Sequence, residues 1–296
     1  MGEKLGMIGL GKMGLALARQ MRNDGHELFG YDIDPERMKL FEGEGGTPAA
    51  SAKILAEKCD VTFSILLQPE HIEENTTGPN GIIHGVIPPA KEGLIHVEMS
   101  TMPPAFQIGL AGKLAGHGIE MLDAPISGSH NKVDDRVITF MVGGNEEAFE
   151  RVRPILEPLA KATTHTGEIG SGSAMKVVTN LFVNSVTALM AEMVVLGERA
   201  GLSHATMEEC LGAGSVRSEM WEVMRPRFFN RDFAPRGAVE IFAKDMGIAI
   251  ELAKEHGLDL QVVPAARKMF QRAEAAGWAK DDASRVLEVY EGKDLG

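Results

Sequence analysis

The first half of the chain alternates short apolar runs with amphipathic segments. Apolar runs of four to nine residues predict buried β-strands, and the segments between them, whose apolar residues recur every three or four positions, predict helices. Strands and helices that alternate in this way indicate an α/β domain with a mostly parallel sheet and crossover helices. The last two runs lie about ten residues apart and are candidates for antiparallel neighbours. The predicted strands are residues 5–8, 26–34, 60–67, 93–100, 119–125 and 136–144.

From residue 170 onward the pattern predicts helices alone. Residues 170–198 read as one helix, about 42 Å long at 1.5 Å per residue, and it is apolar nearly all round, so we expect other elements to enclose it. It also contains Asn180, Asn184 and Glu192, which are costly in hydrocarbon and favour a buried helix over a membrane span. Helical segments with Gly or Pro stops follow to the C-terminus, which predicts an all-α second domain.

The first predicted strand is followed by a glycine-rich turn and a helix. Gly9, Gly11 and Gly14 form the pattern G-x-G-x-x-G, and the helical spacing after them stops at Gly25. In this context the first glycine permits a tight turn and the second lets the backbone approach a pyrophosphate. The third allows the helix to pack closely on the strand, and the helix N-terminus attracts the anion. A Rossmann-type dinucleotide-binding domain is therefore predicted.

The cofactor preference is predicted from the second strand. Asp32 lies 18 residues after Gly14, where a carboxylate can accept hydrogen bonds from the ribose hydroxyls of the adenosine. A 2′-phosphate would be repelled there, and the next arginine, Arg37, is five residues further on. We therefore expect NAD rather than NADP. FAD uses a similar glycine pattern and stays an alternative.

Composition narrows the function classes. The 296 residues carry a net charge of −12, which gives no basic field for a nucleic acid. Cys59 and Cys210 lie in no C-x-x-C or Cys/His ligand spacing, so we expect no metal site and a reducing compartment. The chain opens directly on the first strand, so we expect no signal peptide and a cytoplasmic protein. The domains expected are residues 1–165 and residues 166–296.

Four further groups of residues are candidates for chemistry. The ends of parallel strands face the cofactor crevice. The residues at two of these ends are therefore candidates for the wall beside the nicotinamide half of the cofactor, namely Leu66, Leu67, Ser100 and Thr101. On the long helix, polar side chains follow one stripe at i, i+4 and i+8, and they can form either a ligand-binding stripe or structural hydrogen bonds between helices; they are Lys176, Asn180 and Asn184. The stretch "DAPISGSHN", residues 123–131, gathers polar residues between two strands, and Lys244-Asp245 interrupts an apolar run.

Four blocks in order along the chain resemble the β-hydroxyacid dehydrogenase family, which includes 3-hydroxyisobutyrate dehydrogenase and tartronate semialdehyde reductase. These blocks are "GLGKMG" (Gly9–Gly14), "DAPISGS" (Asp123–Ser129), "GSGSAMKVVTN" (Gly170–Asn180) and "KD" (Lys244–Asp245). The resemblance implies oxidation of a small 3-hydroxy acid to its semialdehyde, or the reverse reduction. It implies Lys176 as the acid/base group, with Asn180 orienting it or the substrate.

The resemblance also assigns the binding residues. It implies that Ser127 and Gly128 hold the substrate carboxylate and that Lys244 lies near cofactor and substrate. The expected substrate contacts are Ser127, Gly128, Ser129 and Lys244. The expected cofactor contacts are Gly9, Leu10, Gly11, Met13, Gly14, Asp32, Leu66, Leu67, His71, Thr101 and Lys244.

The chain departs from the family pattern at three places. Ser129 replaces the second glycine of the Ser-Gly-Gly block, and His130 and Asn131 follow it. Leu66-Leu67 stands where the family has a Leu-Pro pair, and His71 replaces an asparagine. These two changes affect the expected cofactor contacts at the turn after the predicted strand 60–67.

Several functions stay open at this point. The polar residues after Gly128 favour a more polar substrate, such as a glycerate- or threonate-like acid, unless they face solvent. Imine reductases share the architecture but typically lack a lysine at the position of Lys176, and 6-phosphogluconate dehydrogenase has a far larger helical domain. A dinucleotide-binding scaffold without turnover is the alternative from another class. Because so much apolar helix needs cover, we expect a homodimer or homotetramer.

Overall fold

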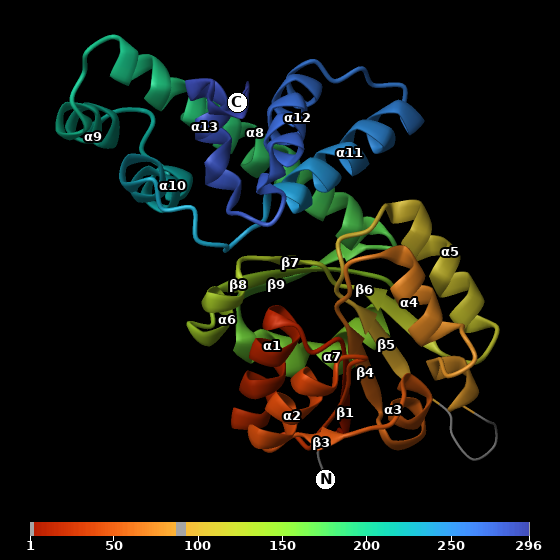
Figure 1. Cartoon of the computed structure of the whole chain (residues 1–296). Coiled ribbons are helices and arrows are strands. Elements are labelled where there is room, and N and C mark those ends of the chain that lie inside the picture. The colour runs from red at the N-terminus through yellow and green to blue at the C-terminus, as the bar shows by residue number, and fades with distance from the viewer. Residues whose placement is uncertain (1–2, 87–92, 296) are drawn as a thin grey trace. The chain divides into compact units, whose positions relative to one another are not determined.

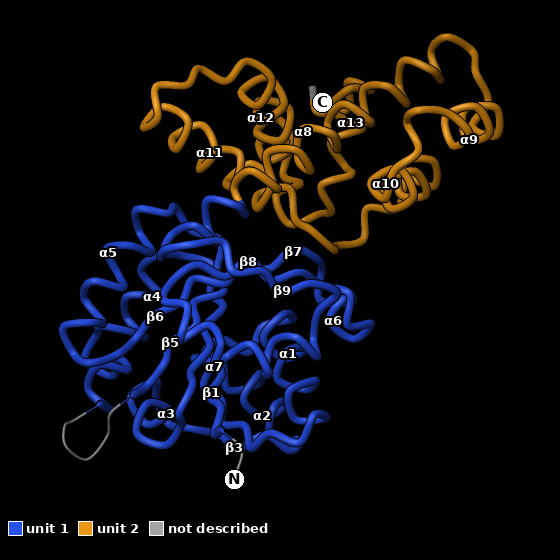
Figure 2. The backbone as a smooth tube through the Cα atoms, turned by 180° about the vertical axis from the view of Figure 1, so that it is seen from behind, with its two compact units in different colours: residues 1–176 blue, residues 177–296 orange. Residues whose placement is uncertain are grey.

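The computed structural model describes residues 3–86 and 93–295. The chain divides into two compact units, Met1–Lys176 and Val177–Gly296 (Figure 2). This division lies inside the long helix α8 (Ser171–Arg199). The domain boundary placed at residue 165 from the sequence stays a prediction.

The first unit is built on a nine-stranded sheet with the strand order β3-β2-β1-β4-β5-β6-β8-β7, in which β9 also pairs with β8. The order reverses between β1 and β4, where ligands of open α/β sheets bind beyond the carboxyl ends of the strands. The strands β1 to β6 pair in parallel. The nine strands are β1 (Leu5–Ile8), β2 (Leu28–Tyr31), β3 (Thr47–Pro48), β4 (Val61–Ser64), β5 (Ile95–Glu98), β6 (Glu120–Asp123), β7 (Ile126–Ser127), β8 (Ile138–Gly143) and β9 (Ala160–Gly167).

The predicted α/β class is confirmed, as is the antiparallel pairing of the last two predicted strands, which are β6 and β8. Three strands were not predicted. The strands β3 and β7 have two residues each, and β9 is a polar, half-exposed strand without an apolar run. The pairing of β9 with β8 is parallel and contains two register shifts. The place of β9 in the sheet therefore depends on its pairing with β8 and not on a hydrophobic pattern of its own.

Helices lie on both sides of this sheet (Figure 1). They are α1 (Lys12–Asn23), α2 (Pro35–Gly43), α3 (Ala52–Lys58), α4 (Pro69–Thr76), α5 (Pro104–Ala115), α6 (His130–Asp134) and α7 (Glu146–Leu156), with 3₁₀ turns at Ile82–His84 and Glu157–Leu159. One core lies under α1 and α7, and a second lies under α3, α4 and α5. Side chains cap three of the helix starts: Asp34 accepts Glu36 N–H, Ser51 accepts Ile54 N–H and Asn145 accepts Ala148 N–H.

The second unit is helical apart from one isolated bridge between Ala238 and Asp282 in the described chain. After α8 come α9 (His204–Ala213), α10 (Glu219–Asn230), α11 (Val239–Glu255), α12 (Val262–Ala273) and α13 (Val286–Glu291), with short turns at Glu274–Trp278, Ala283–Arg285 and Lys293–Leu295. The core of this unit holds the fully buried Trp221, Phe228 and Phe270. The predicted all-helical second domain is thus confirmed.

The expectation that other elements enclose α8 is wrong within this chain. Five apolar side chains of the helix are exposed, namely Met175, Val178, Phe182, Leu189 and Leu196. By length and composition the helix could cross a membrane, and 39% of its most apolar window is buried. Its other apolar residues, among them Ala191 and Val194, lie in the core of the second unit, which favours a packed helix.

Candidate functional site

The three glycines of the predicted dinucleotide turn are required for different reasons. Gly9 has a φ of +88°, and a Cβ there would lie 2.5 Å from the carbonyl oxygen of Ile65. A Cβ on Gly14 would overlap the carbonyl oxygen of Gly9. Gly11 is different, because its φ is −66° and the nearest atom to a Cβ would be Arg37 Nη1, 3.8 Å away. The fold therefore requires Gly9 and Gly14 to be glycine, and it does not require this of Gly11.

Open space at Gly11 is what a dinucleotide site needs at that position, because the phosphates approach the backbone where a side chain is missing. Gly11 is the N-cap of α1, and no side chain caps this helix. The first N–H groups of α1 are therefore available to an anion, which the helix dipole attracts. The residues present fit the pyrophosphate of a dinucleotide.

The carboxylate of Asp32 lies at the end of β2, and its side chain is 4% exposed. Its Oδ2 accepts the N–H of Leu10 at 2.7 Å, and its Oδ1 accepts the N–H of Asp34 at 2.9 Å. Arg37 Nη1 lies 3.4 Å from Asp32 Oδ2, and its Nε lies 3.4 Å from Asp34 Oδ2. Asp32 thus joins the glycine turn to the end of β2. The only arginine near this carboxylate among the described residues is already shared between two acids.

The turn after β4 lies against the glycine turn at the β1/β4 reversal. Leu66 N–H donates to Ser100 Oγ at 2.8 Å, and Leu66 Cδ2 would lie 2.9 Å from a Cβ on Gly9. Leu67 is 63% exposed at the same end of the sheet. Thr101 follows Ser100, and Met13 lies in the first turn of α1. These predicted residues therefore gather around the carboxyl ends of β1, β4 and β5.

Ile33 and His71 lie at the same edge of the sheet. Ile33, which directly follows Asp32, is 91% exposed and was not among the predicted site residues. A large apolar side chain directly after the predicted ribose carboxylate was the signal that could have found it. His71 is exposed on α4, and its backbone carbonyl accepts Asn75 Nδ2.

The stretch Asp123–Asn131 is more ordered than a polar connection. Ser127 pairs with Thr139 in β7–β8, and Gly128 follows with a φ of +132°. A Cβ on Gly128 would lie 2.9 Å from Ile138 Cγ2, so the backbone requires glycine there. Ser129 is the N-cap of α6 but makes no capping hydrogen bond with its side chain.

The helix α6 that begins at His130 packs against α1. Asp134 on α6 accepts Gln20 Nε2 of α1 at 3.0 Å. Burial, and secondly the positive charge of Lys12, lowers the pKa of His130. His130 is therefore partly buried, whereas Asn131 is exposed.

Asp123, the first residue of the stretch, holds the start of α8. Its fully buried carboxylate accepts the N–H of Gly170 at 2.8 Å and that of Ser173 at 2.6 Å. Burial raises the pKa of Asp123, and the two backbone N–H donors oppose that effect. Side chains at Gly143 or Gly172 would collide with this carboxylate. The first residue of the motif is therefore a helix anchor.

On α8, Lys176 is 9% exposed and is the last residue of the first unit. In the second unit, Asn180 Nδ2 donates to Asp245 Oδ2 of α11 at 2.7 Å, and Lys244 Nζ lies 3.3 Å from Asp245 Oδ1. Asn184 Nδ2 donates to the carbonyl of Phe242 at 3.4 Å. The hydrogen bonds between helices that the sequence left open are therefore present for both asparagines. Asp245 is buried, so the Lys244-Asp245 pair is more than a solvated helix face.

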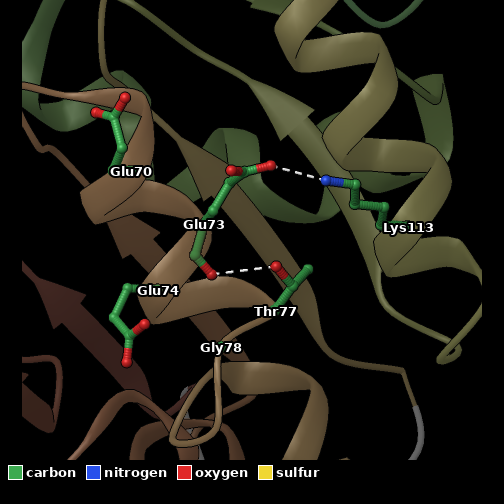
Figure 3. A pocket seen from close by; sticks show the side chains of 6 residues that line it. All are labelled: Glu70, Glu73, Glu74, Thr77, Gly78 and Lys113. Atoms are coloured by element: carbon green, nitrogen blue, oxygen red, sulfur yellow. Dashed lines mark hydrogen bonds and ion pairs between the residues drawn. The ribbon is translucent and has the colours of Figure 1, made fainter.

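A hollow of about 370 Å³ lies between α4 and α5 (Figure 3). Lys113 Nζ forms an ion pair with Glu73 Oε1 across it at 2.7 Å, while Glu70 and Glu74 lie on the same helix as Glu73. None of the predicted site residues lines it. In the described ranges, 3–86 and 93–295, no group of three or more His, Cys, Asp or Glu side chains could hold a metal ion.

Two protein-family models match the chain, one over most of each unit. The family model for the NAD binding domain of 6-phosphogluconate dehydrogenase matches residues 4–167. The model described as NAD-binding of NADP-dependent 3-hydroxyisobutyrate dehydrogenase matches residues 170–290.

Full-length relatives agree with these matches. A 2-(hydroxymethyl)glutarate dehydrogenase of Eubacterium barkeri is 32% identical over 97% of this chain and 95% of its own. An L-threonate dehydrogenase of Cupriavidus necator is 31% identical over 100% of this chain and 98% of its own. A solved 3-hydroxyisobutyrate dehydrogenase from Salmonella typhimurium is 30% identical, with a TM-score of 0.87 and coverage of 97% of this chain and 100% of that one.

Proposed function

The chain belongs to the β-hydroxyacid dehydrogenase family and is an oxidoreductase that acts on hydroxy acids with a nicotinamide dinucleotide cofactor. From this premise we propose that it prefers NAD. We propose that it oxidises a small 3-hydroxy carboxylic acid to its semialdehyde, or reduces that semialdehyde. The observation that carries the cofactor site is Gly11, whose missing side chain the fold itself does not require. When bound, the nicotinamide ring accepts or returns the hydride.

Asp32 supports the preference for NAD. Its carboxylate is fixed by two backbone N–H groups, and Oδ1 keeps one acceptor position for a ribose hydroxyl, since each carboxylate oxygen can accept two hydrogen bonds. A 2′-phosphate would meet both Asp32 and Asp34, while Arg37 is already engaged by both carboxylates. In this arrangement the added phosphate gains little from Arg37 and is repelled by two charges.

Lys176 is proposed as the general acid/base. In the oxidation, the neutral amine takes the proton of the substrate hydroxyl while the carbinol carbon loses its hydride, which leaves a carbonyl; in the reduction, the ammonium returns that proton. The burial of Lys176 keeps bulk water away from this transfer. Asn180, one helical turn further along α8, is proposed to orient Lys176 or the substrate.

The substrate carboxylate is proposed to bind at Ser127 and Gly128. The hydroxyl of Ser127 and backbone N–H groups at the glycine turn are suitable donors, and the turn admits no side chain at Gly128. Ser129 is proposed to add a further polar contact, because no capping bond occupies its side chain. Lys244 is proposed to lie near the substrate and the cofactor.

The class of 3-hydroxy acid is proposed from the residues that follow Gly128. A methyl-bearing substrate such as 3-hydroxyisobutyrate leaves the polar groups of Ser129 and His130 without partners, whereas a glycerate- or threonate-like acid can satisfy them. The relatives named as acting on L-threonate and on 2-(hydroxymethyl)glutarate support a polar substrate. Asn131 is exposed and is left out of this set.

We further propose a cytoplasmic homo-oligomer. The exposed apolar residues of α8 recur at heptad spacing, with Phe182, Leu189 and Leu196 seven residues apart. A stripe of this kind suits a helix of a second copy.

A panel of kcat/KM values over small 3-hydroxy acids, with NAD and NADP, tests the proposed function. We expect NADH formation with polar 3-hydroxy acids and a ratio of kcat/KM for NAD over NADP above about tenfold, or about 1.4 kcal/mol. Clear NAD binding by calorimetry with no turnover of any acid would instead indicate a dinucleotide-binding scaffold. A preference for NADP would contradict the role given to Asp32.

A further inference from the structure

A row of buried polar side chains crosses the first unit between β4 and β5. Thr62 and Ser64 lie on β4, His96 and Glu98 lie on β5, and the register pairs Thr62 with His96 and Ser64 with Glu98. All four are at most 1% exposed. Central strands of a parallel sheet are usually apolar because both of their faces are buried. We call these four residues the polar row.

The hydrogen bonds of the polar row have one consistent direction. Ser64 Oγ donates to Glu98 Oε2. Because a hydroxyl has one proton, Ser64 must accept from His96 Nε2, which lies 3.1 Å away. In its neutral form His96 therefore carries its proton on Nε2, and Nδ1 accepts the hydroxyl of Thr62 at 3.0 Å. Every donor in the row points toward Glu98.

From Glu98 the hydrogen bonds continue to the turn after β4 at Leu66, which we call the cofactor turn. The other carboxylate oxygen, Oε1, accepts Ser100 N–H at 2.7 Å, and Ser100 Oγ accepts Leu66 N–H at 2.8 Å. Ser100 is 2% exposed. Leu66 in turn lies against Gly9, the first glycine of the dinucleotide turn. The buried carboxylate is thus connected by two hydrogen bonds to the wall that Gly9 touches.

We propose that Glu98 is a positioning residue for the cofactor, acting through Ser100 on the turn at Leu66. The inference rests on the cofactor site proposed above, at the carboxyl ends of β1 and β4. Leu66 lies outside the ladder of β4, so the link through Ser100 is a tie that strand pairing does not supply. With Ser100 held by Glu98, the backbone of Leu66 keeps one place, and its side chain stays beside Gly9.

A purely structural role explains the polar row less well. Removing a carboxylate from water costs free energy, and apolar residues of similar volume often stabilise a core at least as well as buried polar groups do. The polar row is also asymmetric, because its charged end is the end nearest the cofactor turn and its neutral end, Thr62, lies toward the opposite edge. A carboxylate that only stabilised the sheet would not need to face this turn.

The inference is tested with Glu98→Gln and Ser100→Ala, with Thr62→Val as the matched control. All three remove or weaken buried hydrogen bonds of one connected network, but Thr62 stands at the end of the polar row away from Glu98 and bonds to His96. We expect Glu98→Gln and Ser100→Ala to raise the dissociation constant of NADH by about fivefold or more, with kcat at saturating cofactor within about twofold. For Thr62→Val we expect an unchanged dissociation constant and a lower melting temperature. Equal losses of affinity in all three variants, or none in Glu98→Gln and Ser100→Ala, would overturn the proposal.

The direction of the hydrogen bonds provides a second readout. In Glu98→Gln the amide oxygen must stay at Ser100 N–H, which needs an acceptor, so the amide N–H₂ faces Ser64. Ser64 must then donate to His96 Nε2, and the His96 proton moves to Nδ1. Imidazole ¹⁵N shifts are expected to show the Nε2–H tautomer in the unaltered protein and the Nδ1–H tautomer in the variant. Observation of the Nδ1–H tautomer in the unaltered protein would contradict the direction assigned to the polar row. Should Glu98→Gln not fold, Ser100→Ala alone decides, because it leaves the carboxylate in place.

A Gly11→Ala variant separates this proposal from the one on which it rests. If Gly11→Ala binds NADH as tightly as the unaltered protein, the cofactor site itself is misplaced and Glu98 has no cofactor to position. If Gly11→Ala loses NADH while Ser100→Ala and Glu98→Gln keep it, the cofactor site stands and the role of Glu98 fails.

Discussion

The carboxylate of Asp123 accepts the backbone N–H of Ser173 at 2.6 Å, three residues before Lys176 on the same helix. The first residue of the "DAPISGS" block and the proposed acid/base lysine are therefore linked by one hydrogen bond and less than one turn of helix. In the proposed arrangement the motif has two tasks, because Asp123 anchors α8 while Ser127 and Gly128 are proposed to hold the substrate carboxylate. Both tasks lie within the first unit.

Replacing Asp123 by Ala is expected to lower the free energy of unfolding by about 2 kcal/mol, because it leaves the N–H groups of Gly170 and Ser173 without an acceptor. Denaturant titration measures this change. The matched control is Asp135→Asn, an exposed carboxylate whose loss should change stability by less than about 0.5 kcal/mol. A loss as small as that of the control would show that α8 does not depend on Asp123.

The same carboxylate predicts a pH dependence. Burial raises the pKa of Asp123 above its ordinary value of 3.8, so the folded state binds this proton more tightly than the unfolded state does. Its contribution to stability is then complete below 3.8 and is lost as the pH rises through the raised value. Relative to Asp123→Asn, which does not titrate, the unaltered protein should therefore lose stability on going from acid to neutral pH. A flat or rising difference in unfolding free energy would contradict this sign.

The glycines of the dinucleotide turn predict opposite outcomes. Gly11→Ala should fold with an unchanged melting temperature and bind NADH at least about tenfold more weakly, since its new methyl group meets only space that the phosphates need. Gly14→Ala should lose about 3 kcal/mol of stability, because its methyl group overlaps the carbonyl of Gly9. Calorimetry for binding and thermal unfolding for stability separate the two. Equal destabilisation by both would mean that Gly11 serves the fold rather than the cofactor.

The proposed acid/base role of Lys176 predicts a loss of turnover without a loss of cofactor. Lys176→Ala should lower kcat by about 10²- to 10⁴-fold, while the dissociation constant of NADH stays within about threefold. Steady-state rates and a fluorescence titration with NADH measure the two effects. Activity within about threefold of the unaltered enzyme would reject Lys176 as the acid/base.

The sequence predicted those parts of the fold and site that depend on neighbours along the chain. The glycine turn, Asp32 after β2, and the spacing of Lys176 and Asn180 on α8 are local patterns, and each was visible as such. The partners of Asp123 were not, because Gly170 and Ser173 are 47 and 50 residues away and meet it only through the antiparallel return of β8.

Some signals were present but were read too simply. His96 and Glu98 stand two residues apart in a run that was read as an apolar strand, as do Thr62 and Ser64 in the neighbouring run. Side chains two apart on a strand share a face, so the two pairs could have been predicted to face each other once the strands were paired. That α8 carries an exposed apolar stripe could not be predicted, because its apolar residues surround the helix and only packing selects the covered side.

The exposed stripe of α8 gives the last prediction, on assembly. Leu189→Glu places a charge in the middle of the heptad positions Phe182, Leu189 and Leu196, where burial against a second helix would leave it without a partner. We expect the variant to shift to a smaller species by light scattering at micromolar concentration and to keep its helical circular dichroism. The control is Leu258→Glu, which alters an equally exposed leucine that lies outside the helices, between α11 and α12, and should leave the mass unchanged. If the unaltered protein is already monomeric, or if Leu189→Glu keeps its mass, the stripe is not the contact between copies.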